Sequence, residues 1–186
     1  MGIFERMAYA IFRIATGNSN KRWFYTPIAG LLFLCFLALF YIAAIFTDKW
    51  LNLPSISHLP WTLIPALILL VPGVILVLWT WIQFIRARGT PVPLNPPREL
   101  ITSGLYAYSR NPMLLGIFLI FLGSGIWMGS LSLTVFYTPL VILVFYFQIT
   151  KIEEKEMELK FGQSYLEYKK KVPLFFPFLN WRGKYN

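Results

Sequence analysis

The feature that most constrains this chain is a stretch of 40 residues, 111–150, that contains no charged side chain. A straight helix of that length would measure about 60 Å, about twice the thickness of the hydrocarbon core of a bilayer. The chain must therefore turn back on itself within the stretch, and Gly129-Ser130 is the natural turn. We expect two antiparallel membrane helices here, at residues 112–128 and 131–149.

Two further apolar segments precede this hairpin. Residues 23–47 carry no charge over 25 positions, which is enough for one span. Residues 59–85 form a second span, which its internal prolines should kink. Only 13% of the chain is charged, against about 25% in soluble domains. The sequence therefore predicts an all-α integral membrane protein of about four transmembrane helices, forming a single domain over residues 1–186.

The remaining segments are more polar. Residues 86–111 hold four prolines within seven positions, which excludes a helix and predicts an ordered loop at the membrane surface. Residues 151–186 begin as a charged helix, which is followed by an interfacial tail. For residues 1–16 we expect an amphipathic helix lying on the membrane surface, with part of a further span as the alternative.

The basic residues give an orientation. The net charge of +9 is carried by clusters beside apolar runs, which is typical of lipid contact and argues against nucleic acid. Lys49 is the only lysine or arginine in the connection 48–58, whereas the N-terminal segment, the loop and the tail are rich in these residues. The positive-inside rule predicts a multi-pass protein of the cytoplasmic membrane with both termini and the loop in the cytoplasm. The oligomeric state is left open.

The loop joins the third span in a pattern that could bind an anion. Asn111 is a good helix N-cap, and Pro112 suits the first helical position. Arg110 adds a full charge beside the helix dipole. The competing interpretation is a well-capped helix with an arginine that reaches lipid headgroups.

Two other groups of residues follow. Glu153 and Glu154 come directly after the last span, where carboxylates are costly unless they are solvated or paired. They either bind a ribose or amino group of a cationic ligand or cap a helix. Gly123 and Gly125 allow close approach to a neighbouring helix or to a ligand. With one histidine and one cysteine, the chain offers no metal cluster, so no metal is expected.

Taken together, these residues resemble the membrane methyltransferase superfamily that includes isoprenylcysteine carboxyl methyltransferases and phospholipid N-methyltransferases. The residues that carry the resemblance are Gly104, Tyr106, Arg110, Asn111, Pro112, Gly116, Gly123, Gly125, Glu153, Glu154 and Leu159, with a tail of Phe161, Gly162, Tyr165, Tyr168, Val172, Pro173 and Pro177. They cover about half of the chain, from residue 86 to residue 177. Their order and spacing around a helical hairpin are distinctive together, although no single element is.

The resemblance implies an S-adenosylmethionine site without a Rossmann fold. The implied cofactor-binding residues are Gly104, Tyr106, Arg110, Asn111, Pro112, Gly116, Gly123, Gly125, Glu153 and Glu154. Arg110 is also the candidate catalytic residue, as the ligand of an anionic group on cofactor or acceptor. The acceptor is expected to be lipophilic: an isoprenylcysteine-type carboxylate or thiol, or a phospholipid amine.

The sequence also departs from the superfamily. Members often have histidine where Asn111 stands, and asparagine cannot titrate, so a proton-transfer role there is in doubt. Two alternatives stay open, a membrane oxidoreductase of the sterol-reductase type and a non-catalytic membrane scaffold.

Overall fold

The computed structural model describes residues 2–17, 19–55, 61–92, 94–95, 97 and 99–175. All regular structure in this part of the chain is helical. The α-helices are α1 (Ile3–Ala15), α2 (Ser19–Trp50), α3 (Leu63–Arg86), α4 (Pro112–Met128), α5 (Thr138–Gln148), α6 (Glu154–Phe161) and α7 (Gln163–Lys171). A 3₁₀ turn, η1 (Gly104–Ala107), and two π-helical turns, η2 (Leu133–Tyr137) and η3 (Ile149–Glu153), complete the set.

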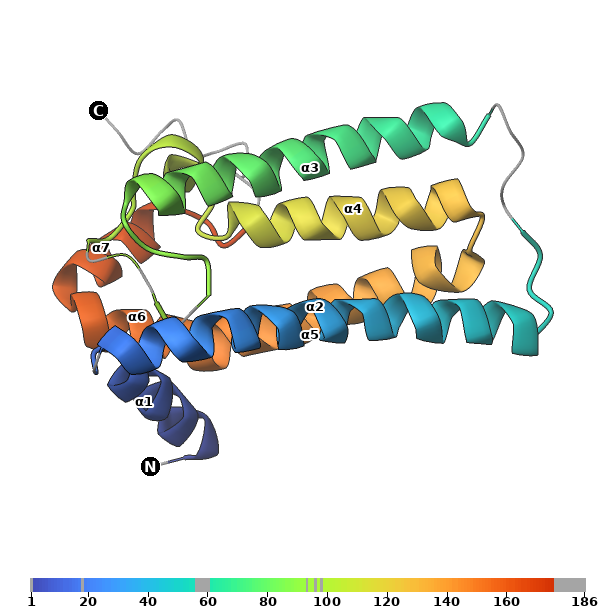
Figure 1. The fold of residues 1–186 in the computed structure, drawn as a ribbon. Helices are drawn as coiled ribbons and strands as arrows, with labels where there is room; N and C mark the ends of the chain where they lie inside the picture. The colour runs from blue at the N-terminus through green and yellow to red at the C-terminus, as the bar shows by residue number, and fades with distance from the viewer. Residues whose placement is uncertain are drawn as a thin grey trace.

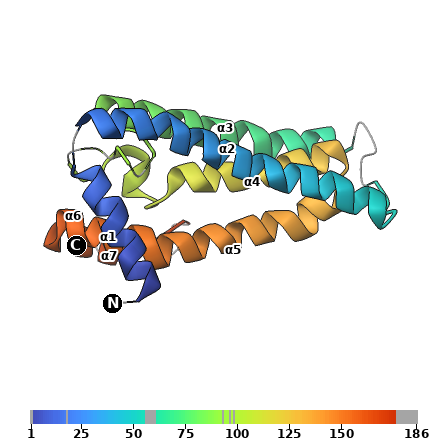
Figure 2. The same cartoon turned by 60° about the horizontal axis from the view of Figure 1, so that its bottom comes forward.

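The long helices run side by side along one axis (Figures 1 and 2). The turn after α4 and the connection after α2 lie at one end of this bundle. Helices α1, α6 and α7 and the loop that follows α3 gather at the other end, which we call the polar end. In the described part of the chain, three helical segments are long and apolar enough to cross a bilayer: Phe24–Trp50, Leu63–Arg86 and Leu133–Phe161.

Helix α4 forms the centre of the bundle. It is apolar around its whole circumference and carries much of the core, including Leu114, Phe118 and Phe121. A helix that is hydrophobic on every side is one that other elements surround. At 17 residues it is shorter than the other three, but it lies antiparallel to α3 within the same layer.

Glycines let α3 and α4 approach closely. A Cβ atom on Gly116 would lie 2.7 Å from the carbonyl oxygen of Gly73, closer than real Cβ contacts allow. A Cβ on Gly123 would lie 3.0 Å from the carbonyl oxygen of Ala66. This small-residue packing is how membrane helices gain contact without a hydrophobic driving force between them.

The hairpin turn forms where the sequence predicted it. Gly129 ends α4 with a φ of 69°, a left-handed conformation that favours glycine. Asp48, at the end of α2, then accepts hydrogen bonds from the Ser130 hydroxyl and, at 2.9 Å, from the backbone N–H of Ser132. The α2 carboxylate therefore caps the start of the helix that follows the turn.

The expected helix positions agree with the structure in most places. Helix α4 covers the range 112–128 expected for the third apolar segment, and the amphipathic α1, Ile3–Ala15, lies within the expected range 1–16. The second span begins at Leu63 rather than at residue 59, and residues 56–60 are outside the described part. One continuous helix runs from Leu133 to Phe161, so the span expected at residues 131–149 continues directly into the charged helix expected from residue 151. The interfacial tail after residue 175 also lies outside the described residues.

Candidate functional site

A cavity of about 1120 Å³ is lined by residues of the polar end and by residues deeper in the bundle. Its apolar wall comes from α2, α3, α4 and α5 and from the loop after α3, which contributes residues such as Val92 and Leu100. Its polar wall groups include Tyr106, Arg110, Asn111, Gln148, Glu153 and Glu156. The cavity therefore joins a charged region at the polar end to a long apolar region between the helices.

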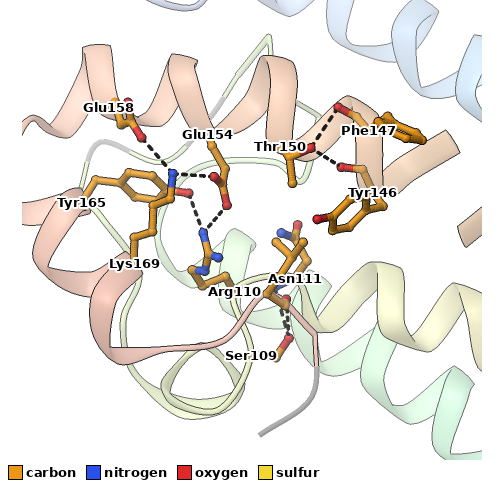
Figure 3. A network of polar contacts seen from close by, with 11 residues as sticks. Ser109, Arg110, Asn111, Tyr146, Phe147, Thr150, Glu154, Glu158, Tyr165 and Lys169 are labelled. Carbon is orange, nitrogen blue, oxygen red and sulfur yellow. Dashed lines mark hydrogen bonds and ion pairs between the residues drawn. The ribbon is translucent and has the colours of Figure 1, made fainter. Parts of the chain in front are cut away.

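Arg110 is held by an ion pair that crosses 44 positions of sequence. Its Nη1 donates to Glu154 Oε1, and it lies 3.4 Å from the Tyr165 hydroxyl (Figure 3). Lys169 pairs with the other oxygen of Glu154 and, at 3.0 Å, with Glu158. Arg110 and Glu154 have side chains that are only 11% and 8% exposed, so the pair is desolvated and its geometry is constrained.

The segment after α7 fixes the backbone on either side of Arg110. The N–H of Arg110 donates to the carbonyl of Pro173 at 2.9 Å, and the N–H of Asn111 donates to that of Leu174 at 3.1 Å. The Ser109 hydroxyl also donates to Leu174, at 3.1 Å. The Val172-Pro173 part of the sequence pattern therefore acts as an extended strap that positions the loop.

Two buried tyrosines on α7 support the same loop. The Tyr168 hydroxyl donates to the backbone carbonyl of Tyr106 at 2.7 Å. Burial raises the pKa of Tyr168 and, with the Glu154 carboxylate adding to it, that of Tyr165. Both hydroxyls stay protonated at neutral pH and remain hydrogen-bond donors.

Lys169 remains a full cation. Burial works to lower its pKa, but its hydrogen bonds with Glu154 and Glu158 outweigh that effect and raise the pKa. Glu154 therefore faces two cations, Arg110 and Lys169, and is a structural partner of Arg110 rather than part of the cavity wall.

Glu153 does reach the cavity, because it belongs to the π-helical turn η3. Gln148 donates to it at 2.8 Å across five positions of sequence, a separation that an ordinary α-helix places about 1.4 turns apart. The adjacent Glu153-Glu154 pair is therefore divided, one carboxylate facing the cavity and the other facing Arg110.

Three of the glycines that the sequence predicted at the cofactor site pack against neighbouring helices instead. Gly116 and Gly123 pack against α3, and a Cβ on Gly125 would lie 2.5 Å from the Thr134 hydroxyl oxygen across the hairpin. None of the three lines the cavity. Gly104 adopts a φ of +62° beside the Gln83 side chain and allows the loop to turn into η1.

The start of α4 is partly as expected. Asn111 is the N-cap residue and Pro112 is the first helical residue. The prediction that the Asn111 side chain caps the helix is wrong, since it makes no capping hydrogen bond. The Asn111 residue lines the cavity instead, and the Ser109 hydroxyl accepts a hydrogen bond from its backbone N–H at 3.2 Å.

Sequence reasoning missed Gln148 and Glu156 as cavity residues. Glu156 stands three positions after Glu153, one helical turn along the same face, and this spacing is visible in the sequence. Gln148 was hidden by its position near the end of an apolar run. Only the π-helical turn brings it beside Glu153.

A helical bundle with three membrane-length segments defines an integral membrane protein, and this one contains an internal cavity with a charged region at one end. The family model described as phospholipid methyltransferase matches residues 61–164, which is more than half of the chain. The chain belongs to the phospholipid methyltransferase family.

Curated relatives match a little under half of the sequence. The protein-S-isoprenylcysteine O-methyltransferase of Schizosaccharomyces pombe is 36% identical over 85 residues, which cover 46% of this chain and 36% of that protein. The human protein of the same name is 38% identical over 82 residues, covering 43% of this chain and 28% of the relative. The chain thus matches only about a third of the length of these relatives. No solved structure matches it.

Proposed function

We propose that this chain is a methyltransferase that uses S-adenosylmethionine and acts on a lipophilic acceptor. The observation that carries the proposal is the cavity, which connects part of the sequence pattern, namely Tyr106, Arg110, Asn111 and Glu153, to an apolar region between membrane helices. Its volume of about 1120 Å³ exceeds the roughly 300–1,000 Å³ that is usual for one ligand. Two molecules, a methyl donor and an acceptor, can therefore meet inside it.

The polar part of the cavity fits a nucleoside cofactor with an amino-acid group. Among the described residues, the buried Nε–H of Arg110 has no partner, and neither does the buried amide oxygen of Gln148. Burying such groups costs free energy unless a ligand completes their hydrogen bonds. We assign the Arg110 Nε–H as the donor to the carboxylate of the cofactor. The part of the cavity wall around Glu153 is assigned to the cationic part of the cofactor. The tyrosines and the loop from Gly104 to Asn111 would enclose the nucleoside.

The apolar part fits an acceptor that arrives from the bilayer. The α2 wall of the cavity runs from Thr26 to Tyr41, a rise of about 22 Å along the helix. That length corresponds to most of the hydrocarbon core, so a lipid chain can lie beside α2 with its head toward Arg110.

Methyl transfer requires mainly that the two reacting groups be held in line. The cofactor supplies an electrophilic methyl group, and the acceptor must be held in line with it. In this chain the Arg110–Glu154 pair and the Pro173–Leu174 strap fix the position of the loop. The surrounding helices keep water away from the apolar part of the cavity.

We further propose that the polar end faces the cytoplasm. The polar end carries the basic residues of α1, the loop and α7, and the opposite end carries Lys49. Soluble S-adenosylmethionine would then reach the cavity directly from the cytoplasm.

The proposal is tested with purified protein in lipid nanodiscs, S-adenosylmethionine carrying a labelled methyl group, and a membrane lipid extract. We expect label in the lipid phase for the wild type and at least tenfold less for Glu153→Gln. Glu167→Gln, an exposed carboxylate on α7, is the matched control. Binding of a nicotinamide cofactor in place of S-adenosylmethionine would instead favour the oxidoreductase alternative, and binding of neither would favour a scaffold.

A further inference from the structure

The π-helical turn η3 changes which side chains face the cavity. It places Gln148 beside Glu153, although the two are five residues apart, and Glu156 follows one turn later on the same face. Single π-helical turns within α-helices are frequent at functional sites. Glu156 lies outside the pattern that the sequence shares with the superfamily, and so does Gln148.

Gln148, Glu153 and Glu156 have more hydrogen-bond acceptors facing one another than donors. The Glu153 carboxylate can only accept, so the amide nitrogen of Gln148 must face it. The amide oxygen of Gln148 is then buried without a partner among the residues that the structure describes. Glu156 is only 4% exposed and lines the cavity. In the part of the chain that the structure describes, no hydrogen bond or ion pair engages its carboxylate.

The nearby cations have other partners, although Lys160 also attracts the Glu156 carboxylate. Arg110 pairs with Glu154, and the Lys160 ammonium donates to the carbonyl of Pro97 at 2.8 Å. Two carboxylates, the half-buried Glu153 and the buried Glu156, therefore share one wall of the cavity. Like charges in such a place repel each other unless a cation or a proton comes between them.

We propose that Gln148, Glu153 and Glu156 form a subsite for a primary ammonium group. An ammonium group has three N–H donors and no acceptor, and the three side chains offer three acceptors and a negative charge. A sulfonium group has no hydrogen to donate, and a ribose hydroxyl carries no charge. The inference rests on the proposed function and assigns the subsite to the ammonium of the amino-acid part of S-adenosylmethionine.

Calorimetric titration with three ligands tests this assignment. S-adenosylmethionine has both cations, S-adenosylhomocysteine has only the ammonium, and 5′-methylthioadenosine has neither. We expect Glu156→Gln and Gln148→Leu each to weaken the binding of S-adenosylmethionine and of S-adenosylhomocysteine equally, by at least tenfold. The affinity for 5′-methylthioadenosine should stay unchanged. Glu167→Gln is the control and should change none of them. The Tm of ligand-free Glu156→Gln should equal or exceed that of the wild type, because the variant removes a repulsion.

Each other outcome overturns the subsite. An equal loss for 5′-methylthioadenosine would place these residues at the nucleoside, and a loss confined to S-adenosylmethionine would place them at the sulfonium. Unchanged binding of all three would leave them without a ligand role. If the wild type binds no adenosyl ligand, the proposed function fails, and octylammonium then tests the subsite alone. Octylammonium should raise the Tm of the wild type but not that of Glu156→Gln. Octyltrimethylammonium, which has no N–H, should raise the Tm of neither protein. Equal effects of the two amines on the wild type would reject the ammonium subsite.

Discussion

Arg110 sits where the loop, the start of α4 and the strap after α7 meet. Its Nη1 donates to Glu154, while its buried Nε–H has no partner within the described part of the chain. The interpretation of Arg110 as a lipid-headgroup anchor requires an exposed guanidinium, and this side chain is 11% exposed. The geometry instead favours a residue that is oriented by one carboxylate and offers its Nε–H to another.

Arg110→Lys separates charge from geometry. Lysine keeps the charge needed by Glu154 but loses Nε–H and the planar donor arrangement. We expect a Tm near that of the wild type and a turnover reduced at least tenfold, since hydrogen bonds to charged groups contribute about 1.5–3 kcal/mol. Methyl-transfer kinetics and thermal unfolding in detergent measure the two quantities. Arg86→Lys, at the exposed end of α3, is the control, and full turnover in Arg110→Lys would remove Arg110 from the site.

Pairs such as Arg110–Glu154 could not be predicted from the sequence. The two residues are 44 positions apart, and hydropathy carries no information about which side chains meet across a bundle. What the sequence did show was that both residues stand at the ends of apolar segments, at the same end of the bundle.

At the scale of elements, the length and polarity of the apolar runs predicted the helices well. The range of α4 and the turn at Gly129 follow from the 40-residue uncharged stretch and bilayer thickness. The π-helical turns could not be predicted from these features. A hydropathy pattern identifies an apolar segment but does not determine whether its hydrogen bonds run to the fourth or the fifth residue, and that choice decides which side chains face the cavity.

The close packing of α3 and α4 makes Gly116→Ala a sharp test of the fold. Its Cβ would meet the backbone of Gly73 at 2.7 Å, so the two helices must move apart. We expect a marked fall in Tm, because core overpacking costs about 1–3 kcal/mol. Gly30→Ala on α2 is the matched control. Its Cβ would meet Val92 at 3.9 Å, an ordinary contact, and alanine is the better helix former, so its Tm should be unchanged or higher. Equal Tm values for the two variants would contradict the packing.

Asp48→Ala tests the cap on the hairpin turn. The variant leaves the N–H of Ser132 and the hydroxyl of Ser130 without their acceptor, at a cost of about 1–3 kcal/mol. We expect the Tm to fall by several degrees, with a smaller fall for Asp48→Asn, which keeps an acceptor oxygen. Lys49→Ala, at the neighbouring exposed position, should have no effect. A Tm of Asp48→Ala equal to that of Lys49→Ala would mean that the cap does not stabilise the fold.

At the scale of the whole molecule, the four helical segments alternate in direction, so the elements divide between two ends. Helix α1, the loop after α3, and α6 with α7 share the polar end, and the turn at Gly129 lies at the other (Figures 1 and 2). The whole of the proposed cofactor part of the cavity is built at the polar end. Its accessibility to a soluble cofactor therefore depends on which side of the membrane that end faces.

Cysteine labelling decides the orientation. The only native cysteine, Cys35, is exposed on α2 within a span and is first replaced by serine. Ser55→Cys, after α2, and Asn95→Cys, in the loop, then report on opposite ends of the bundle. With a membrane-impermeant maleimide on intact cells, we expect Ser55→Cys to react and Asn95→Cys to react only after permeabilisation, because the basic residues stay in the cytoplasm. Labelling of both positions from outside would contradict the four-span arrangement. Labelling of Asn95→Cys alone would invert it and would require the cofactor to reach the cavity from the opposite side.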